Sequence, residues 1–179
     1  MPDPSKSAQS STDPVRLPWL DAMASSGALG YFRSFLGYRH PLTRLPDGAI
    51  STHLTFSQEH TSYPGVVHGG VIGGVVDQLM GDTVALERQI LAFSITLRVR
   101  MIRPLLVDRT YQAKARIDHD ASGVICAEAE VLDDSPAVHV FATGSFRPIR
   151  SDQARDIMSL STAERVALSE YFEKGVHPQ

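Results

Sequence analysis

The sequence predicts an α+β domain in which a curved antiparallel sheet covers one central helix. One apolar segment with helical spacing follows a strand-like stretch, and four alternating stretches come after it. Turn residues separate these stretches where strands would have to reverse. With 179 residues and 42% hydrophobic side chains, the chain is long enough for one such core with extra elements at both ends.

Five segments have the composition of strands. Ile50 to Ser57 precedes the predicted helix. Four more follow it, and their residues alternate or nearly alternate between apolar and polar: Phe93 to Ile102, Thr110 to His119, Val124 to Leu132 and Val138 to Phe146. Because turn residues stand between them, we expect these four strands to form an antiparallel meander.

The regions outside this domain, which we place at residues 49–150, differ in composition. Residues 1–14 carry almost no apolar side chains, so we expect a disordered tail. Residues 15–48 contain two amphipathic pieces, Trp19 to Met23 and Leu29 to Leu36, which indicate an N-terminal helical extension. Residues 151–179 contain a Ser-x-x-Glu start at Ser161 and a stop at Gly175, which predict a C-terminal helix.

Charge and composition exclude several classes of function. The formal net charge of -3, from 17 basic and 20 acidic side chains, offers no electrostatic footprint for nucleic acid or an anionic membrane. No apolar run reaches the roughly 18 residues of a membrane-spanning helix. Cys126 is the single cysteine, and the first residues lack the pattern of a secretory signal. We therefore expect a cytoplasmic protein without nucleic-acid or membrane partners.

Sequence motifs for metals and common cofactors are missing. No pair of histidines has the spacing of a zinc site, so we expect no metal. The stretch His68-Gly-Gly-Val-Ile-Gly-Gly is neither a dinucleotide fingerprint nor a phosphate-binding loop. The Gly-x-Ser-x-Gly elbow of a serine hydrolase is also missing.

The central helical segment, residues 68–82, carries one carboxylate among glycines. Two rows of residues at four-residue spacing are apolar, which suits the concave side of a sheet. Each interior glycine costs about 0.8 to 1 kcal/mol of helix propensity relative to alanine, so several together indicate a close contact. The remaining two rows are Gly70, Gly74 and Gln78, and Gly73, Asp77 and Gly81.

This pattern has two interpretations. In the first, the glycines form a packing face and Asp77 is a buried hydrogen-bond acceptor. In the second, Gly69 and Gly70 present free N–H groups at the positive end of the helix, where they would stabilise an oxyanion. The carboxylate would then act as base or nucleophile in acyl transfer.

Helix geometry sets a condition on the second interpretation. Gly70 and Asp77 are seven residues apart, which corresponds to about 10.5 Å along the helix axis. One substrate carbonyl group cannot contact both. The functional interpretation therefore predicts a two-fold dimer in which Asp77 of one subunit faces Gly70 of the other.

The stretch Tyr63-Pro-Gly-Val-Val-His68-Gly-Gly, with Asp77 nine residues after the histidine, resembles the hotdog-fold acyl-CoA thioesterases of the phenylacetate-degradation (PaaI-like) group. Ile102-Arg103-Pro104 at a strand end resembles a second landmark of that group. The resemblance covers about Ile50 to Pro148. It implies a hotdog fold, and hydrolysis of an acyl-CoA to a free acid and coenzyme A by a homodimer or a dimer of dimers, without a cofactor.

The resemblance also assigns catalytic roles by position. Gly70, with Gly69 as a second candidate, would donate a backbone N–H to the oxyanion. Asp77 would be the general base or the nucleophile, and Ser94 would hold the attacking water or the carboxylate. His68 would fix the loop and could bond the thioester. Because Asp77 lies among glycines and aliphatic residues, we expect desolvation to raise its pKa and a hydrogen bond from Ser94 to offset part of the rise.

Three further residues are candidates. Many members of the group have an asparagine six residues before the histidine, where this chain has Ser62, whose hydroxyl reaches less far. Val67 and Arg103 are candidates for substrate binding. Two other functions on the same fold stay open: a non-catalytic protein that binds acyl-CoA or regulates through it, and an enoyl-CoA hydratase.

Overall fold

The structure is a computed structural model, and it describes residues 13–15, 17, 35–37, 41–135, 137–150, 153 and 157–172. Its helical elements are the 3-10 turn η2 (Gln58–His60), α3 (Gly69–Arg88) and α5 (Thr162–Phe172). Its strands are β1 (Asp13–Val15), β2 (Leu42–Arg44), β3 (Ile50–Thr55), β4 (Thr61–Tyr63), β5 (Val66–Val67), β6 (Leu91–Met101), β7 (Thr110–Ala121), β8 (Val124–Leu132) and β9 (Val138–Ile149).

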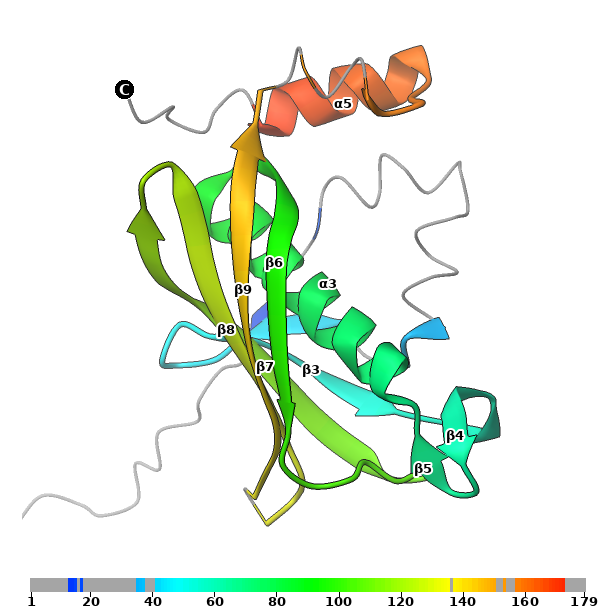
Figure 1. Ribbon diagram of the computed structural model, residues 1–179. Helices are drawn as coiled ribbons and strands as arrows, with labels where there is room; N and C mark the ends of the chain where they lie inside the picture. Colours follow the sequence, from blue (N-terminus) through cyan, green and yellow to red (C-terminus); the bar gives the residue numbers. More distant parts are fainter. Residues whose placement is uncertain are drawn as a thin grey trace, which may run out of the picture.

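One antiparallel sheet curves around the central helix, as predicted. Seven strands follow the order β1-β2-β3-β7-β8-β9-β6, and α3 lies along the concave face (Figure 1). The meander prediction is confirmed for β7, β8 and β9, and it is wrong for β6, which pairs with β9. The connection from β6 to β7, residues 102–109, is too long for a tight hairpin, and it carries the chain from the β6 edge past β9 and β8 to β7.

The helix α3 packs through its two apolar rows. Ile72, Val75 and Val76, with Leu79 and Met80 one turn later, are buried at 3% exposure or less. Small side chains face them from the sheet and let the helix approach closely: Ala113, Ala115, Ala127, Ala129 and Ala142.

The helix also continues past residue 82, the end of the predicted segment. Two buried polar residues near its C-terminal end are hydrogen-bonded within the helix: Thr83 Oγ1 donates to Leu79 O at 2.8 Å, and Asp82 Oδ1 accepts from Gln78 Nε2 at 3.0 Å. Gln89 then ends the helix in a left-handed conformation, with φ 51°.

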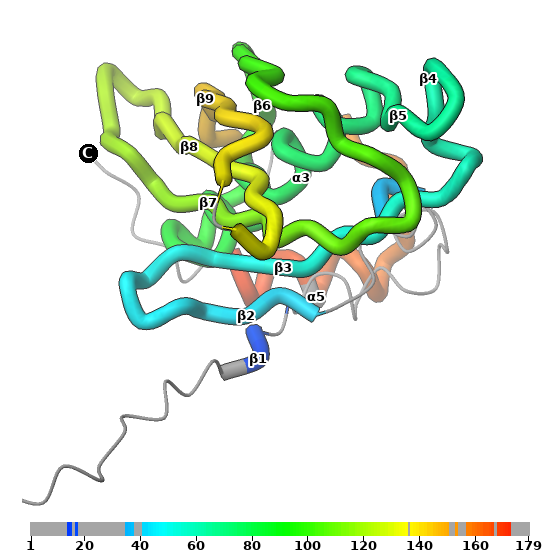
Figure 2. The backbone as a smooth tube through the Cα atoms, turned by 90° about the horizontal axis from the view of Figure 1, so that it is seen from below, coloured from blue at the N-terminus to red at the C-terminus, as the bar shows by residue number. Residues whose placement is uncertain are grey.

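The two ends of the chain add to this body in different ways. Strands β1 and β2 lie where the sequence predicted a tail and a helical extension, and they widen the sheet beyond β3 (Figure 2). The predicted helical piece Trp19 to Met23 and residues 29–34 lie outside the described residues. The predicted C-terminal helix is confirmed as α5, where Ser161 and Glu164 form the expected capping box. No helix in the described ranges is long and apolar enough to cross a membrane.

Strand β6 forms one edge of the sheet and exposes large apolar side chains. Its strand neighbour within the described part of the chain is β9. The exposed fractions are 38% for Phe93, 42% for Ile95, 41% for Leu97 and 52% for Met101. A long apolar edge strand is a template for pairing with another chain.

Candidate active site

The N-terminus of α3 is capped by the histidine that precedes it. His68 has an extended backbone, and its Nδ1 accepts a hydrogen bond from the Gly70 N–H at 2.8 Å. Because Nδ1 acts as an acceptor, the neutral ring carries its proton on Nε2. The His68 side chain is exposed, so this helix end presents an imidazole N–H to the surface.

The backbone N–H of Gly69 is the free donor at this end of the helix. Val71 and Ile72 both donate to His68 O, and Gly70 donates to the His68 ring. Among the described residues, the Gly69 N–H donates no hydrogen bond. A free N–H at a helix N-terminus attracts an oxyanion.

The loop before the helix is fixed by backbone hydrogen bonds from three directions. His68 N donates to His60 O at 2.7 Å, and Val67 N donates to Leu105 O at 2.9 Å. Val107 N donates to Gly65 O at 3.1 Å. The predicted site residue Val67 is 3% exposed, so its side chain packs in the hydrophobic core and does not line an open surface.

The row of α3 that contains Asp77 faces β6. A methyl group at Gly69 would lie 2.9 Å from Met101 Cε, and one at Gly73 would lie 4.0 Å from Leu97 Cδ2. The glycines of this row therefore make a packing contact, as the first interpretation of the sequence expected. Asp77 is the exception, because a carboxylate replaces a small residue in the same row.

The Asp77 carboxylate is poorly solvated and incompletely paired. Within the part of the chain that the structure describes, its Oδ1 is the one buried side-chain oxygen or nitrogen without a hydrogen-bond partner. Burial raises the pKa of this carboxyl above its ordinary value, and hydrogen bonding from the Ser94 side chain acts in the opposite direction. Both effects agree with the expectation from the sequence. A buried oxygen of this kind requires a donor that is not among these residues.

A β-bulge turns Ser94 toward Asp77. Ser94 pairs with Phe146 and Thr96 pairs with Ser145, so Ile95 is an extra residue in β6. Phe146 is buried in the core, and the residue directly opposite it points to the same face of the sheet. In a regular strand, Ser94 would share the face of Thr96, away from the helix. The sequence analysis did not predict this bulge.

Arg103 lies in the connection after β6, which is tied to the hairpin between β8 and β9. The N–H groups of Ile102 and Arg103 both donate to His139 O, at 2.8 and 3.1 Å. The His139 ring contacts Pro104 O through Nδ1 at 3.1 Å and Asp133 Oδ2 through Nε2 at 3.0 Å. The Arg103 side chain is exposed on this fixed loop.

The predicted site residues fall into two places. His68, Gly69 and Gly70 meet at the N-terminus of α3, while Asp77 and Ser94 meet about two helical turns further along. Ser62 is exposed on β4, and no side-chain hydrogen bond connects it to other described residues.

The sequence analysis also missed His60, a buried residue next to the loop. Its Nδ1 accepts a hydrogen bond from Ser57 N at 2.9 Å, and its Nε2 contacts Phe35 O. The ring also contacts the rings of Phe35 and Phe56. These contacts join segments far apart in the chain, which the local pattern does not reveal.

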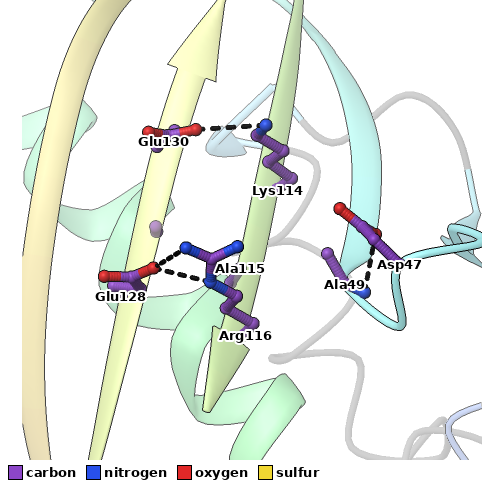
Figure 3. A pocket seen from close by; sticks show the side chains of 8 residues that line it. Asp47, Ala49, Lys114, Ala115, Arg116, Glu128 and Glu130 are labelled. Carbon is purple, nitrogen blue, oxygen red and sulfur yellow. Dashed lines mark hydrogen bonds and ion pairs between the residues drawn. The ribbon is translucent and has the colours of Figure 1, made fainter. Parts of the chain in front are cut away.

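A hollow on the outer face of the sheet is a poorer candidate for a site (Figure 3). Its charged side chains are already paired, Lys114 with Glu130 at 3.1 Å and Arg116 with Glu128. Asp47 accepts a hydrogen bond from Ala49 N. The described residues contain no cluster of three metal-ligating side chains.

Comparison with solved structures supports this architecture. E. coli PaaI, from the phenylacetic acid degradation operon, matches 74% of this chain and 94% of its own, with a TM-score of 0.61 and 14% identity. The protein smu.793 from Streptococcus mutans, solved with acetyl CoA, matches 57% of this chain and 82% of its own, with a TM-score of 0.53 and 19% identity.

A thioesterase superfamily protein matches 59% of this chain, with a TM-score of 0.56 and 23% identity. The match spans about half of that protein's length, 52%. No protein-family model and no curated protein matches the chain. At these identities the likeness shows the fold, and the chain has the hotdog fold that the sequence analysis predicted.

Proposed function

We propose that this protein is a homodimeric acyl-CoA thioesterase in which each subunit completes the other's active site. The observation that carries the proposal is the buried Asp77 oxygen without a partner, on the same helix whose N-terminus presents two free donors. Two structural neighbours with this fold were solved with acetyl CoA and with coenzyme A, which supports a thioester substrate.

The geometry of α3 requires the second subunit. Asp77 lies eight residues after Gly69, a distance of about 12 Å along the axis. A base must come within hydrogen-bond distance of the attacking water, so the Asp77 of the same chain cannot serve a carbonyl group held at Gly69. An antiparallel α3 from a second copy would bring its own Asp77 to that place. Pairing of two β6 edges would supply the contact surface.

In the proposed reaction, the thioester oxygen accepts hydrogen bonds from Gly69 N–H and His68 Nε2–H. The Asp77 carboxylate of the partner removes a proton from water, and the hydroxide attacks the carbonyl carbon. The developing negative charge moves onto the oxygen between the two donors. When the carbon–sulfur bond breaks, the thiolate takes the proton from Asp77, and the products are a free acid and coenzyme A.

Three of the remaining candidate residues have a place in this proposal. Ser94 orients the carboxylate that it faces, and Arg103 offers a cation to the phosphates of coenzyme A. Gly70 N–H is held by the His68 ring, so Gly69 takes the first position as backbone donor. Ser62 stays a prediction without a contact that supports it.

A complementation experiment tests the shared site. The variants Asp77→Asn and His68→Ala are each expected to release thiol from a panel of acyl-CoA esters at least about 100-fold more slowly than the wild type. When the two are unfolded and refolded together, half of the dimers should be mixed, and each mixed dimer should hold one intact site. Roughly a quarter of the wild-type activity should then return. No recovery would contradict a site shared between subunits.

The same assay separates catalysis from binding. Release of thiol by the wild-type protein supports the enzyme. Tight binding of acyl-CoA by calorimetry, with no thiol released over hours, would instead indicate a protein that binds acyl-CoA without hydrolysing it.

A further inference from the structure

We propose that Leu36, from the segment before the domain, restricts the enzyme to short acyl groups. It would do so by closing the acyl slot, which we define as the space along Gly70 and Gly74 of α3 that would hold the acyl chain. This inference rests on the proposed thioesterase function and concerns which thioesters the site accepts. It starts from the contact between Leu36 and the glycine row of α3 that does not face β6. Leu36 is 2% exposed, although it precedes the first long strand of the sheet.

The two glycines of this row, Gly70 and Gly74, have different neighbours: Gly70 is next to the histidine that caps its own helix, and Gly74 is next to Leu36. Among the described residues, a methyl group at Gly70 would meet only the ring of its own cap, His68, at 3.0 Å. A methyl group at Gly74, one turn later, would lie 3.0 Å from Leu36 Cδ2. The neighbouring row is already filled by Met101 and Leu97 of β6. An acyl group leaving the carbonyl at the helix end therefore has about 6 Å along this row before it meets Leu36.

The segment that carries Leu36 is anchored on both sides. Phe35 O contacts Nε2 of the buried His60, which must be a donor because Nδ1 accepts from Ser57 N. Gly37 O accepts a hydrogen bond from Thr55 N at 3.2 Å. Gly37 has φ +81°, and a methyl group there would lie 2.9 Å from Thr55 O, so a glycine is required. Leu36 is held against the helix by these contacts.

The anchor is shared with the catalytic loop. His60 holds Phe35 through its side chain, and its carbonyl oxygen accepts the His68 N–H at 2.7 Å. The residue that positions the closing leucine therefore also positions the loop that holds the thioester. This arrangement makes the length of the slot a fixed property of the site.

The test compares Leu36→Ala with a matched control. Leu42→Ala shortens another leucine of the same region, also 2% exposed, that lies on β2. Thiol release is measured with acetyl-, butyryl-, octanoyl- and palmitoyl-CoA. The wild type should prefer the short esters, and Leu36→Ala should raise the octanoyl to butyryl ratio of kcat/KM about tenfold. Leu42→Ala should leave this ratio unchanged.

Two further variants sharpen the test, and the first of them keeps it decisive if Leu36→Ala does not fold. Leu36→Val removes less volume and should shift the ratio in the same direction by a smaller factor. Adding Gly74→Ala to Leu36→Ala should reverse the shift, because the new methyl group occupies the space that the leucine left.

The outcomes distinguish this inference from the proposed function. A folded Leu36→Ala or Leu36→Val variant with the wild-type octanoyl to butyryl ratio of kcat/KM overturns the inference. The proposed thioesterase function is not affected by that result. A wild type that hydrolyses palmitoyl-CoA as well as butyryl-CoA also overturns it. No thiol release from any ester overturns the proposed function, and this inference with it.

Discussion

The Nδ1 atom of His68 accepts a hydrogen bond from the Gly70 amide at 2.8 Å, so the same side chain caps the helix and points its Nε2–H outward. His68→Ala removes both the cap and the donor. We expect thiol release to fall about 100-fold to 1000-fold, the usual effect of losing one oxyanion donor. The helix should also lose about 1 kcal/mol of stability with its cap, which urea unfolding can measure.

His68→Asn separates these two roles. An asparagine is a good N-cap and can accept the Gly70 N–H through its side-chain oxygen, but its amide does not reach as far as the imidazole Nε2. We expect wild-type unfolding free energy with the activity of His68→Ala. Wild-type activity in His68→Asn would show that the cap, and not the Nε2–H, is what the reaction needs.

Because Asp77 is buried, we predict that its carboxylate lowers the stability of the fold at neutral pH although the reaction needs it. The folded-state pKa of Asp77 is raised above its unfolded value, so its favourable contribution is present at low pH and is lost as the pH rises through the folded pKa. At neutral pH the ionised group therefore destabilises the fold. Asp77→Asn should be at least as stable as the wild type at pH 7, while thiol release falls about 100-fold to 10000-fold. Urea unfolding at pH 7 that shows a large loss of stability would contradict this account of the carboxylate.

Ser94 predicts a shift in the pH dependence of catalysis. A general base works when it is deprotonated, so kcat/KM should rise with pH through the pKa of Asp77, which lies above the ordinary 3.8. Hydrogen bonding from Ser94 lowers that pKa. Ser94→Ala should therefore move the acid limb to higher pH. Thr96→Ala, on the other face of β6, is the control and should leave the limb in place.

Periodicity was enough to predict the five longest strands and the central helix, because each buries one regular set of apolar residues. Strand β8 has the predicted bounds, and the rows of α3 pack as expected. The position of β6 could not be read in this way, because a strand that pairs with β9 has the same alternation as one that pairs with β7. The bulge at Ile95 was missed for a related reason, since one extra residue changes the face of Ser94 without changing the composition.

For the candidate site, the sequence placed Asp77 and Ser94 together through a resemblance, and the structure gives the physical reason for their contact. Local patterns could not show that the His68 ring holds the Gly70 N–H and leaves Gly69 as the free backbone donor. The contacts of His60 with Phe35 and of Leu36 with Gly74 join residues more than 20 positions apart. Interactions of this kind depend on the packed fold.

The exposed edge strand predicts how the dimer can be broken. Ile95→Lys places a charge on β6, where a charged side chain prevents edge-to-edge pairing. The mass in solution should fall to that of one chain, and thiol release should be lost with the shared site. Val166→Lys makes the same change at a residue of α5 that is 54% exposed, and it should alter neither. A monomeric wild type, or an active Ile95→Lys monomer, would rule out the shared site.

We predict that Asp133, at the hairpin between β8 and β9, affects both the stability of the fold and the affinity for substrate. Hydrogen bonds from Ser135 and His139 hold the pKa of Asp133 well below its ordinary value. A lowered pKa contributes stability above the unfolded value of 3.8, and this contribution is lost as the pH falls through the folded pKa. Asp133→Asn should therefore unfold at lower urea concentration than the wild type at pH 7, and the difference should shrink below pH 3.8.

The functional consequence of Asp133→Asn follows from the His139 ring, which bridges Asp133 and Pro104 O next to Arg103. When the ring loses its carboxylate partner, the loop that presents Arg103 is held less firmly. We expect KM for acyl-CoA to rise several-fold, because Arg103 is proposed to bind the coenzyme A phosphates, while kcat changes little because the reacting groups lie on α3. Asp134→Asn removes the same charge from the neighbouring exposed residue and should leave KM unchanged. If both variants raise KM equally, net charge accounts for the effect and the loop does not.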